Sequence, residues 1–165
     1  LTLSQEAYVS LNGAVIESGL ADIIDVELGR GAETIGRLTA LAREKGRLAL
    51  LSNHIFKGTP PKAEILSIFL RMQEFAADVT KLAVMAHSAA DVLMLFEASL
   101  TMKEEYGDRP FIAISMGKEG VISRIGGGFF GSALTYAKGR ESSAPGQLEI
   151  SEVRHIVDLL HGRDA

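Results

Sequence analysis

Residues 48–56, LALLSNHIF, form the stretch from which the fold can be worked out: an apolar run of strand character that ends in polar side chains. Those polar residues are Ser52, Asn53 and His54. The next apolar run, residues 81–85 (KLAVM), opens with Lys81, and one helix-sized segment separates the two runs. This order is typical of two parallel strands joined by a crossover helix. Neighbouring strands lie about 5 Å apart, so His54 and Lys81 are candidates for an acid–base and Schiff-base pair.

The composition favours an ordinary globular domain. The chain has 165 residues, 47% of them apolar, and a net charge of −4. This length is enough for one domain with a sizeable core. The negative net charge does not indicate a surface that binds nucleic acid. The absence of cysteine excludes disulfides and thiolate metal sites and suits a cytoplasmic protein. No apolar run approaches the roughly 20 residues of a membrane span, and the four histidines show no metal-ligand spacing.

Strand-like and helix-like segments alternate along the chain. The expected strands are residues 22–28, 48–56, 81–85, 109–115 and 130–136. The expected helices are residues 3–18, 31–45, 60–77, 88–105, 119–125 and 152–160. Repeated strand-then-helix order predicts a parallel sheet with helices outside it. Polar residues gather at the carboxyl ends of the strands, which is the site-bearing edge of an α/β barrel or open sheet.

Two carboxylates lie on one face of the first expected strand. Ile24, Val26 and Leu28 alternate with Ile23, Asp25 and Glu27, so the apolar set is expected to face a covering helix. Carboxylates on the other face are costly unless that face is solvated or is a site. A solvated edge is the simpler alternative, and an interior site is the preferred interpretation.

Each candidate residue also has an ordinary structural interpretation. A lone histidine such as His54 is most often a satisfied core residue, and Lys81 is expected first to extend to the rim of the sheet. Arg124, in VISRIGGG, is either a surface charge or an anchor for a carboxylate or phosphate. Residues 126–131, GGGFFG, match G-x-G-x-x-G but precede an expected strand, so they lack the geometry that cradles a phosphate.

The ordered motifs add a resemblance to a family. SNH, KLAVM, SMGKEGVISR, FGSALTY and SAPGQ follow one another in this sequence. Together they resemble type I 3-dehydroquinate dehydratase, the Schiff-base lyase of the shikimate pathway of aromatic amino-acid biosynthesis. The resemblance implies an α/β fold, a (β/α)8 TIM barrel, with residues 1–165 as one domain. That domain is expected to supply about the last five β/α units, the C-terminal two-thirds of the barrel. It also implies a small-molecule substrate, 3-dehydroquinate, a homodimer, and no metal or organic cofactor.

The resemblance also assigns roles to residues. Lys81 matches the imine-forming lysine, His54 the general acid/base, and Arg124 the group that binds the substrate carboxylate. The other matches are the substrate-binding or site-lining residues Ser143, Gln147, Met116 and Tyr136, and the supporting acidic residues Asp25 and Glu27.

The sequence departs from the family pattern in two places. Ile55 follows the histidine where Asp or Asn is usual, and this is expected to change how His54 is oriented. The family's first three strands, which bring further substrate-binding side chains, have no counterpart in residues 1–165. Two alternatives stay open: another Schiff-base lyase of the aldolase type, and an inactive fragment or scaffold.

Overall fold

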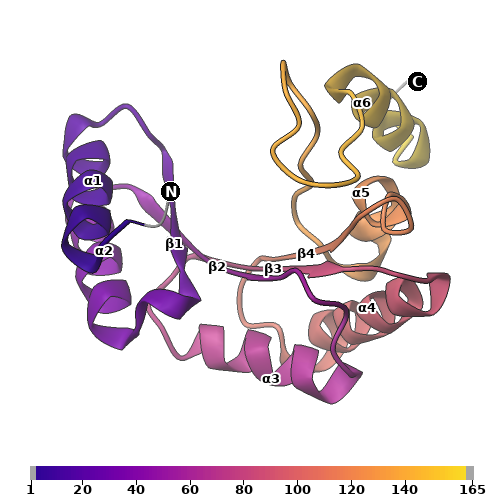
Figure 1. Cartoon of the computed structure of the whole chain (residues 1–165), viewed down its shortest axis with the longest axis horizontal. Coiled ribbons are helices and arrows are strands. Elements are labelled where there is room, and N and C mark those ends of the chain that lie inside the picture. The colour runs from indigo at the N-terminus through magenta and orange to yellow at the C-terminus, as the bar shows by residue number, and fades with distance from the viewer. Residues whose placement is uncertain (1–2, 163–165) are drawn as a thin grey trace.

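The structure is a computed structural model that describes residues 3–162. The elements that build the sheet and its covering layer come in alternating order (Figure 1). They are α1 (Gln5–Ser18), β1 (Ile23–Glu27), α2 (Ala32–Glu44), β2 (Leu48–Ile55), α3 (Lys62–Gln73), β3 (Val79–Met85), α4 (Ala89–Thr101), β4 (Phe111–Met116), α5 (Ile122–Gly126) and α6 (Ile150–Leu160). Short helical turns follow several of them: Leu28–Arg30, Met102–Tyr106 and Gly127–Phe130.

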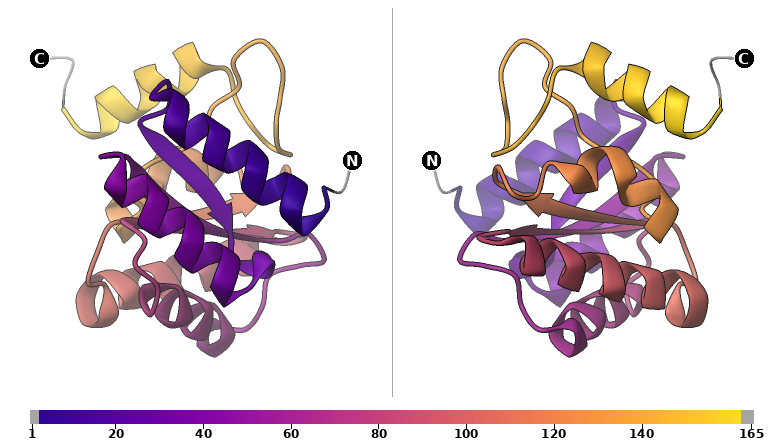
Figure 2. Two further views of the ribbon diagram at one scale, coloured as in Figure 1. Left: turned by 90° about the vertical axis from the view of Figure 1, so that its left-hand side faces the viewer. Right: turned by 90° about the vertical axis from the view of Figure 1, so that its right-hand side faces the viewer.

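The four strands form one parallel sheet in the order β1-β2-β3-β4. α2 packs on β2, α3 on β3 and α4 on β4, so the helices line one side of the sheet. The two side views in Figure 2 agree with this layering. We call the helix-covered side the outer face. The other side, which we call the inner face, carries Asp25, Ser52, His54, Lys81 and Met116.

The outer face holds the main hydrophobic core. Val26, Leu51 and Leu82 are fully buried there, among the apolar side chains of the covering helices. A second, smaller cluster lies on the inner face and contains Leu50, Ala83, Ile112, Ile114 and Met116. The expected alternation in β1 is confirmed, because Ile24 and Val26 are buried while the residues between them are exposed.

Local sequence explains where the helices begin and end. Ser4 precedes α1 and its side chain accepts a hydrogen bond from the Ala7 N–H, while Gly19 closes the helix with a positive φ of 71°. Ser88 and Asp91 form a capping box at the start of α4. The expected order of strands and helices is confirmed through β4.

The expected fifth strand, residues 130–136, is wrong. Gly127–Phe130 is a 3-10 helix, and Gly131 ends it with a φ of 97°. Within residues 3–162, only one bridge, between Ser132 and Phe111, continues the sheet. The Ser132 hydroxyl also accepts a hydrogen bond from the Ala113 N–H. In a fifth strand, a backbone carbonyl would accept this hydrogen bond. The chain then leaves the sheet and rises as the 137–149 loop to α6 (Figure 1).

Of the helices within residues 3–162, none has the length and apolar character needed to cross a membrane.

Leu51 and Leu48 provide a matched test of the outer-face core, because they lie on the same strand with 0% and 47% of their surface exposed. Leu51→Ala should lower the free energy of unfolding by about 2–5 kcal/mol, since it leaves a cavity in a close-packed core. Leu48→Ala should change it by less than about 0.5 kcal/mol. Urea denaturation of both variants checks this, and equal losses would contradict the assignment of the two faces.

Candidate active site

The inner face brings a row of polar side chains together from three strands. In the parallel register Glu27 lies opposite Ser52, and Ser52 lies opposite Lys81. His54 lies two residues beyond Ser52 on the same face, opposite Ala83. The expectation that His54 and Lys81 come from adjacent strands is therefore confirmed. Glu27 and His54 lie at the carboxyl ends of β1 and β2, where sites of parallel α/β folds are found, whereas Lys81 is the third residue of β3.

The side chain of Lys81 is enclosed, not extended to the rim of the sheet. The residue is 8% exposed, and its Nζ donates to Asp25 Oδ2 at 3.1 Å. The same Nζ lies 4.7 Å from the centre of the Tyr136 ring. The expectation that Lys81 extends to solvent is wrong because Asp25, two strands away, provides a counter-charge on the inner face. A charged amine that is enclosed in this way is costly without a counter-charge.

The face of β1 that carries Asp25 and Glu27 is both solvated and part of the site. The Asp25 side chain is 43% exposed, yet it pairs with Lys81. Glu27 instead forms an ion pair with Arg30 at 2.9 Å. Asp25 is therefore a direct partner of the buried amine, whereas Glu27 borders the site.

His54 keeps a neutral ring at neutral pH. Partial burial is the main cause that lowers the pKa of His54 below its ordinary value of 6.5, and the nearby Lys81 cation lowers it further. Within residues 3–162 no group hydrogen-bonds to the ring, which stacks on Phe56 with a 6.2 Å centroid separation. A neutral imidazole with a free nitrogen can accept a proton.

Ile55 does not lie beside the His54 ring, although the two residues are neighbours in sequence. Ile55 is partly buried against the outer-face core, whereas His54 lies on the inner face. Successive residues of a strand point to opposite faces. The expected effect of Ile55 on the orientation of His54 therefore has no direct contact to support it.

Arg124 is the largest fully buried side chain and holds the 137–149 loop over the inner face. Its Nη1 donates to the Tyr136 carbonyl at 3.1 Å and its Nη2 to the Pro145 carbonyl at 2.9 Å. Nε is buried and has no partner among residues 3–162. Burial lowers the pKa of Arg124 below its ordinary value. A buried guanidinium with an unpaired nitrogen is suited to an anion.

The loop is shaped by contacts within itself and with the turn after β4. The Gln147 side-chain oxygen accepts the Ser143 N–H at 2.8 Å, and its nitrogen donates to the Ser143 hydroxyl at 3.0 Å. The Gly117 N–H donates to the Pro145 carbonyl. Gly146 has a φ of 77° and approaches Gly117 so closely that a Cβ would overlap its carbonyl oxygen. The sequence SAPGQ thus makes a compact turn against the β4 end of the sheet.

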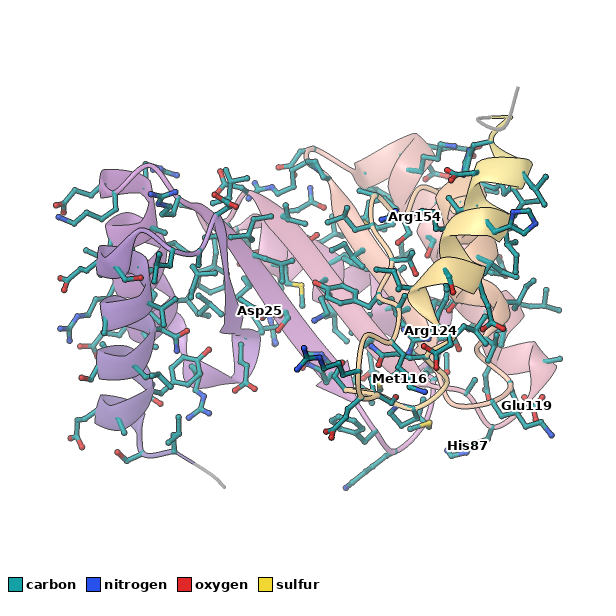
Figure 3. All side chains as sticks on the ribbon, turned by 90° about the horizontal axis from the view of Figure 1, so that it is seen from above. Asp25, His87, Met116, Glu119, Arg124 and Arg154 are labelled. Atoms are coloured by element: carbon teal, nitrogen blue, oxygen red, sulfur yellow. The ribbon has the colours of Figure 1, made fainter. Side chains whose placement is uncertain are left out.

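Two adjoining cavities connect the predicted site residues. A cavity of about 170 Å³ is lined by His54, Lys81, Ala83, Ile114, Met116, Arg124, Tyr136, Ser143, Ala144 and Gln147. A second, of about 430 Å³, is lined by Glu27, Gly29, Ser52, Asn53, His54, Phe56, Met116, Ser143 and Ala144. His54 and Met116 border both cavities. Figure 3 shows Asp25 on β1 and, across the inner face, Met116 and Arg124 near the loop. The structure therefore brings together all of the predicted residues, Asp25 through its bond to Lys81.

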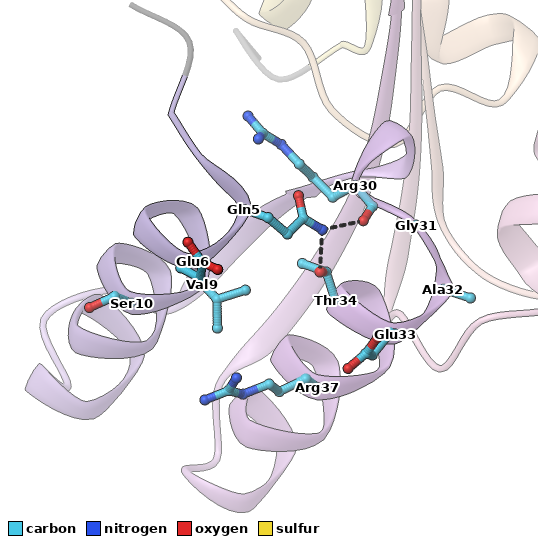
Figure 4. A pocket seen from close by; sticks show the side chains of 10 residues that line it. All are labelled: Gln5, Glu6, Val9, Ser10, Arg30, Gly31, Ala32, Glu33, Thr34 and Arg37. Carbon is cyan, nitrogen blue, oxygen red and sulfur yellow. Dashed lines mark hydrogen bonds between the residues drawn. The ribbon is translucent and has the colours of Figure 1, made fainter.

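A larger cavity, about 630 Å³, lies elsewhere, between α1 and the start of α2 (Figure 4). Gln5 spans it by donating to the Arg30 carbonyl and to the Thr34 hydroxyl. None of the predicted site residues lines this cavity. It is a gap between two helices of the covering layer, and it is separate from the inner face.

Ser52 is the site residue that sequence reasoning did not assign. It lies in the Glu27–Ser52–Lys81 row and lines the larger of the two adjoining cavities. Its position two residues before His54 was the available signal, because residues of one strand two apart share a face. Across residues 3–162 no group of three or more His, Cys, Asp or Glu side chains is arranged to hold a metal ion.

Comparison with known proteins gives consistent matches. A family model for type I 3-dehydroquinase matches residues 1–164. The 3-dehydroquinate dehydratase of Escherichia coli (strain K12 / DH10B) is 45% identical over 159 residues, which are 96% of this chain and 63% of the relative.

Solved structures agree with this. Type I 3-dehydroquinate dehydratase from Clostridium difficile, with covalent modified comenic acid, superposes with a TM-score of 0.93 at 44% identity, over 99% of this chain and 64% of that one. The 3-dehydroquinate dehydratase from Geobacillus kaustophilus superposes with a TM-score of 0.91 at 35% identity, over 100% of this chain and 63% of that chain. The chain thus spans slightly less than two-thirds of these relatives, which corresponds to part of their TIM barrel. The chain belongs to the type I 3-dehydroquinase family.

Proposed function

We propose that this chain carries the imine-forming and proton-transferring groups of a 3-dehydroquinate dehydratase. The reaction is loss of water from 3-dehydroquinate to give 3-dehydroshikimate. The observation that carries the proposal is the enclosed Lys81 amine, which shares one cavity with His54 and Arg124. The identity of the substrate is inferred from the names of the relatives. The chain covers 63% of the E. coli relative.

Lys81 is assigned to covalent catalysis. Its amine attacks the ketone carbon of the substrate, and the resulting carbinolamine loses its hydroxyl as water to leave an iminium ion. The iminium withdraws electrons from the neighbouring carbon and so acidifies the C–H bond there. Enclosure beside the Tyr136 ring limits the positions that the reacting nitrogen can occupy.

His54 is assigned to proton transfer. Its lowered pKa keeps the ring neutral near pH 7, so it can take the proton from the acidified C–H bond. The protonated ring then gives that proton to the departing hydroxyl, which leaves as water. Water hydrolyses the product imine and returns the free Lys81 amine.

Arg124 and the 137–149 loop are assigned to substrate binding. The unused Nε of Arg124 can donate to the substrate carboxylate while its other nitrogens hold the loop. Ser143 and Gln147 line the same cavity. They can donate hydrogen bonds to substrate hydroxyls once the hydrogen bonds between these two residues are broken. Met116 and Tyr136 form apolar walls. A homodimer stays a prediction from the family resemblance.

Borohydride trapping tests the Schiff base directly. Adding 3-dehydroquinate and borohydride should produce a covalent adduct on Lys81, because hydride reduces the iminium to a stable amine. Peptide mass spectrometry locates the adduct, and Lys81→Met is the control. An adduct on another lysine would contradict the assignment. An adduct formed with retro-aldol products would favour an aldolase-type lyase, and active protein without any adduct would overturn the proposal.

Substitution of His54 tests the proton-transfer role. His54→Ala should reduce turnover by about 100-fold to 10,000-fold, since it removes the general acid/base. His87→Ala is the matched control, because His87 is exposed and bonds to the Lys57 carbonyl outside the cavity. Formation of the conjugated ketone, followed by ultraviolet absorbance, measures turnover, and circular dichroism checks the fold. Equal turnover in the two variants would exclude His54 from the mechanism.

The electrostatic link between His54 and Lys81 can be measured by NMR titration. The pKa of His54 should lie below 6.5 and should rise in Lys81→Met, because a nearby cation is removed. Lys62→Met, which removes a surface lysine paired with Glu97, should leave it unchanged. The lowered pKa also means that the free energy of unfolding should decrease as the pH falls below 6.5 toward the folded-state pKa. An unchanged pKa in Lys81→Met would contradict this link.

A further inference from the structure

The ion pair between Lys81 and Asp25 crosses a strand. Lys81 lies on β3 and Asp25 on β1, and β2 runs between them. Their side chains nevertheless meet at 3.1 Å. The lysine side chain therefore passes over β2 on the inner face. The β2 residues of that face at this level are Leu50, opposite Asp25, and Ser52, opposite Lys81.

Ser52 has a buried hydroxyl with no partner. The residue is 0% exposed, and its Oγ makes no hydrogen bond to any group within residues 3–162. A buried hydroxyl is normally paired, because leaving it unpaired costs free energy. Its neighbours across the strands are Glu27 on β1 and Lys81 on β3, each about 5 Å away between backbones, and of these two Lys81 is the one that can donate a hydrogen bond from its side chain. Ser52 is also smaller than Leu50 and His54, the residues on either side of it on this face, so it leaves room for the lysine to cross.

We propose that Ser52 is a positioning residue for Lys81: its hydroxyl accepts an N–H of the neutral amine that forms when the Lys81 ammonium gives a proton to the Asp25 carboxylate. This inference rests on the proposed function, in which the amine must become a nucleophile. A lysine paired with a carboxylate is a charged ammonium without a free lone pair. The neutral amine no longer needs the carboxylate, but it still needs a hydrogen-bond acceptor to fix the direction of its lone pair. The unpaired Ser52 hydroxyl supplies that acceptor beside the cavity.

The position of Ser52 suits this role better than that of the other unpaired hydroxyls. Thr80, Ser99 and Ser115 are also buried and also have an unpaired hydroxyl. Thr80 directly precedes Lys81 on β3, so its side chain points to the opposite, outer face. Ser99 lies in α4, and Ser115 alternates with Ile114 and Met116, so it points to the outer face. Neither adjoins an amine on the inner face. Ser99→Ala is therefore a matched control, the same chemical change at an equally buried, unpaired hydroxyl.

The test uses the reactivity of Lys81 toward a simple aldehyde, which needs no dehydration of 3-dehydroquinate. The protein is treated with limiting formaldehyde and cyanoborohydride, and methylation of each lysine is measured by peptide mass spectrometry. Lys62 on the surface is the internal reference. Ser52→Ala should lower the ratio of Lys81 to Lys62 labelling by about fivefold, the effect of one hydrogen bond. Ser99→Ala should leave the ratio unchanged.

Ser52→Thr, which keeps a hydroxyl, should label like the wild-type protein, and it keeps the test valid if Ser52→Ala does not fold. An unchanged ratio in Ser52→Ala, an equal loss in Ser99→Ala, or a loss in Ser52→Thr would each overturn the inference. The outcome is separate from that of the proposed function. A protein that shows the expected labelling but traps no adduct with 3-dehydroquinate supports the role of Ser52 and contradicts the substrate.

Discussion

The ion pair between Lys81 and Asp25 is the interaction on which the site depends. A lysine amine held inside a protein loses its hydration and needs a counter-charge to remain there. Asp25 provides that charge from two strands away, and this is possible only because β1, β2 and β3 are parallel and in the observed register. The pair keeps the amine on the inner face, 4.7 Å from the Tyr136 ring. Without it the long side chain of Lys81 would be free to extend to solvent.

Arg124 performs a comparable task at the other side of the cavity. Its guanidinium is buried, and two of its nitrogens bind the carbonyls of Tyr136 and Pro145. The 137–149 loop is thereby fixed over the sheet, where Gly146 allows it to approach the turn at Gly117. Arg124 therefore contributes both to the position of the loop and to the positive charge at the cavity. The cavity combines a paired amine, a neutral imidazole and a partly unpaired guanidinium.

Much of the fold was predictable, because hydrophobic periodicity reports which face of an element is buried. The alternation in β1 and the continuous apolar run of β3 identified their strands, and the helix expected from residue 88 corresponds to α4, which begins at Ala89. The segment 130–136 has strand-like residues but does not form a strand. Gly131 and the Ser132 hydroxyl, which binds the Ala113 N–H, end the regular pairing with β4 after one bridge. Competition between a side chain and the backbone for one donor is not visible in a periodic pattern.

The sequence by itself determined the order of strands and helices through β4, the family, and the residue types at the site, because local periodicity and ordered motifs are properties of the chain. Only the tertiary structure decided that Lys81 is enclosed and that Asp25 is its partner. It also placed Ser52 beneath the path of the lysine side chain. These facts depend on the register between strands that are far apart in sequence. Register is fixed by packing of the whole sheet against its helices, and no single segment of the sequence contains it.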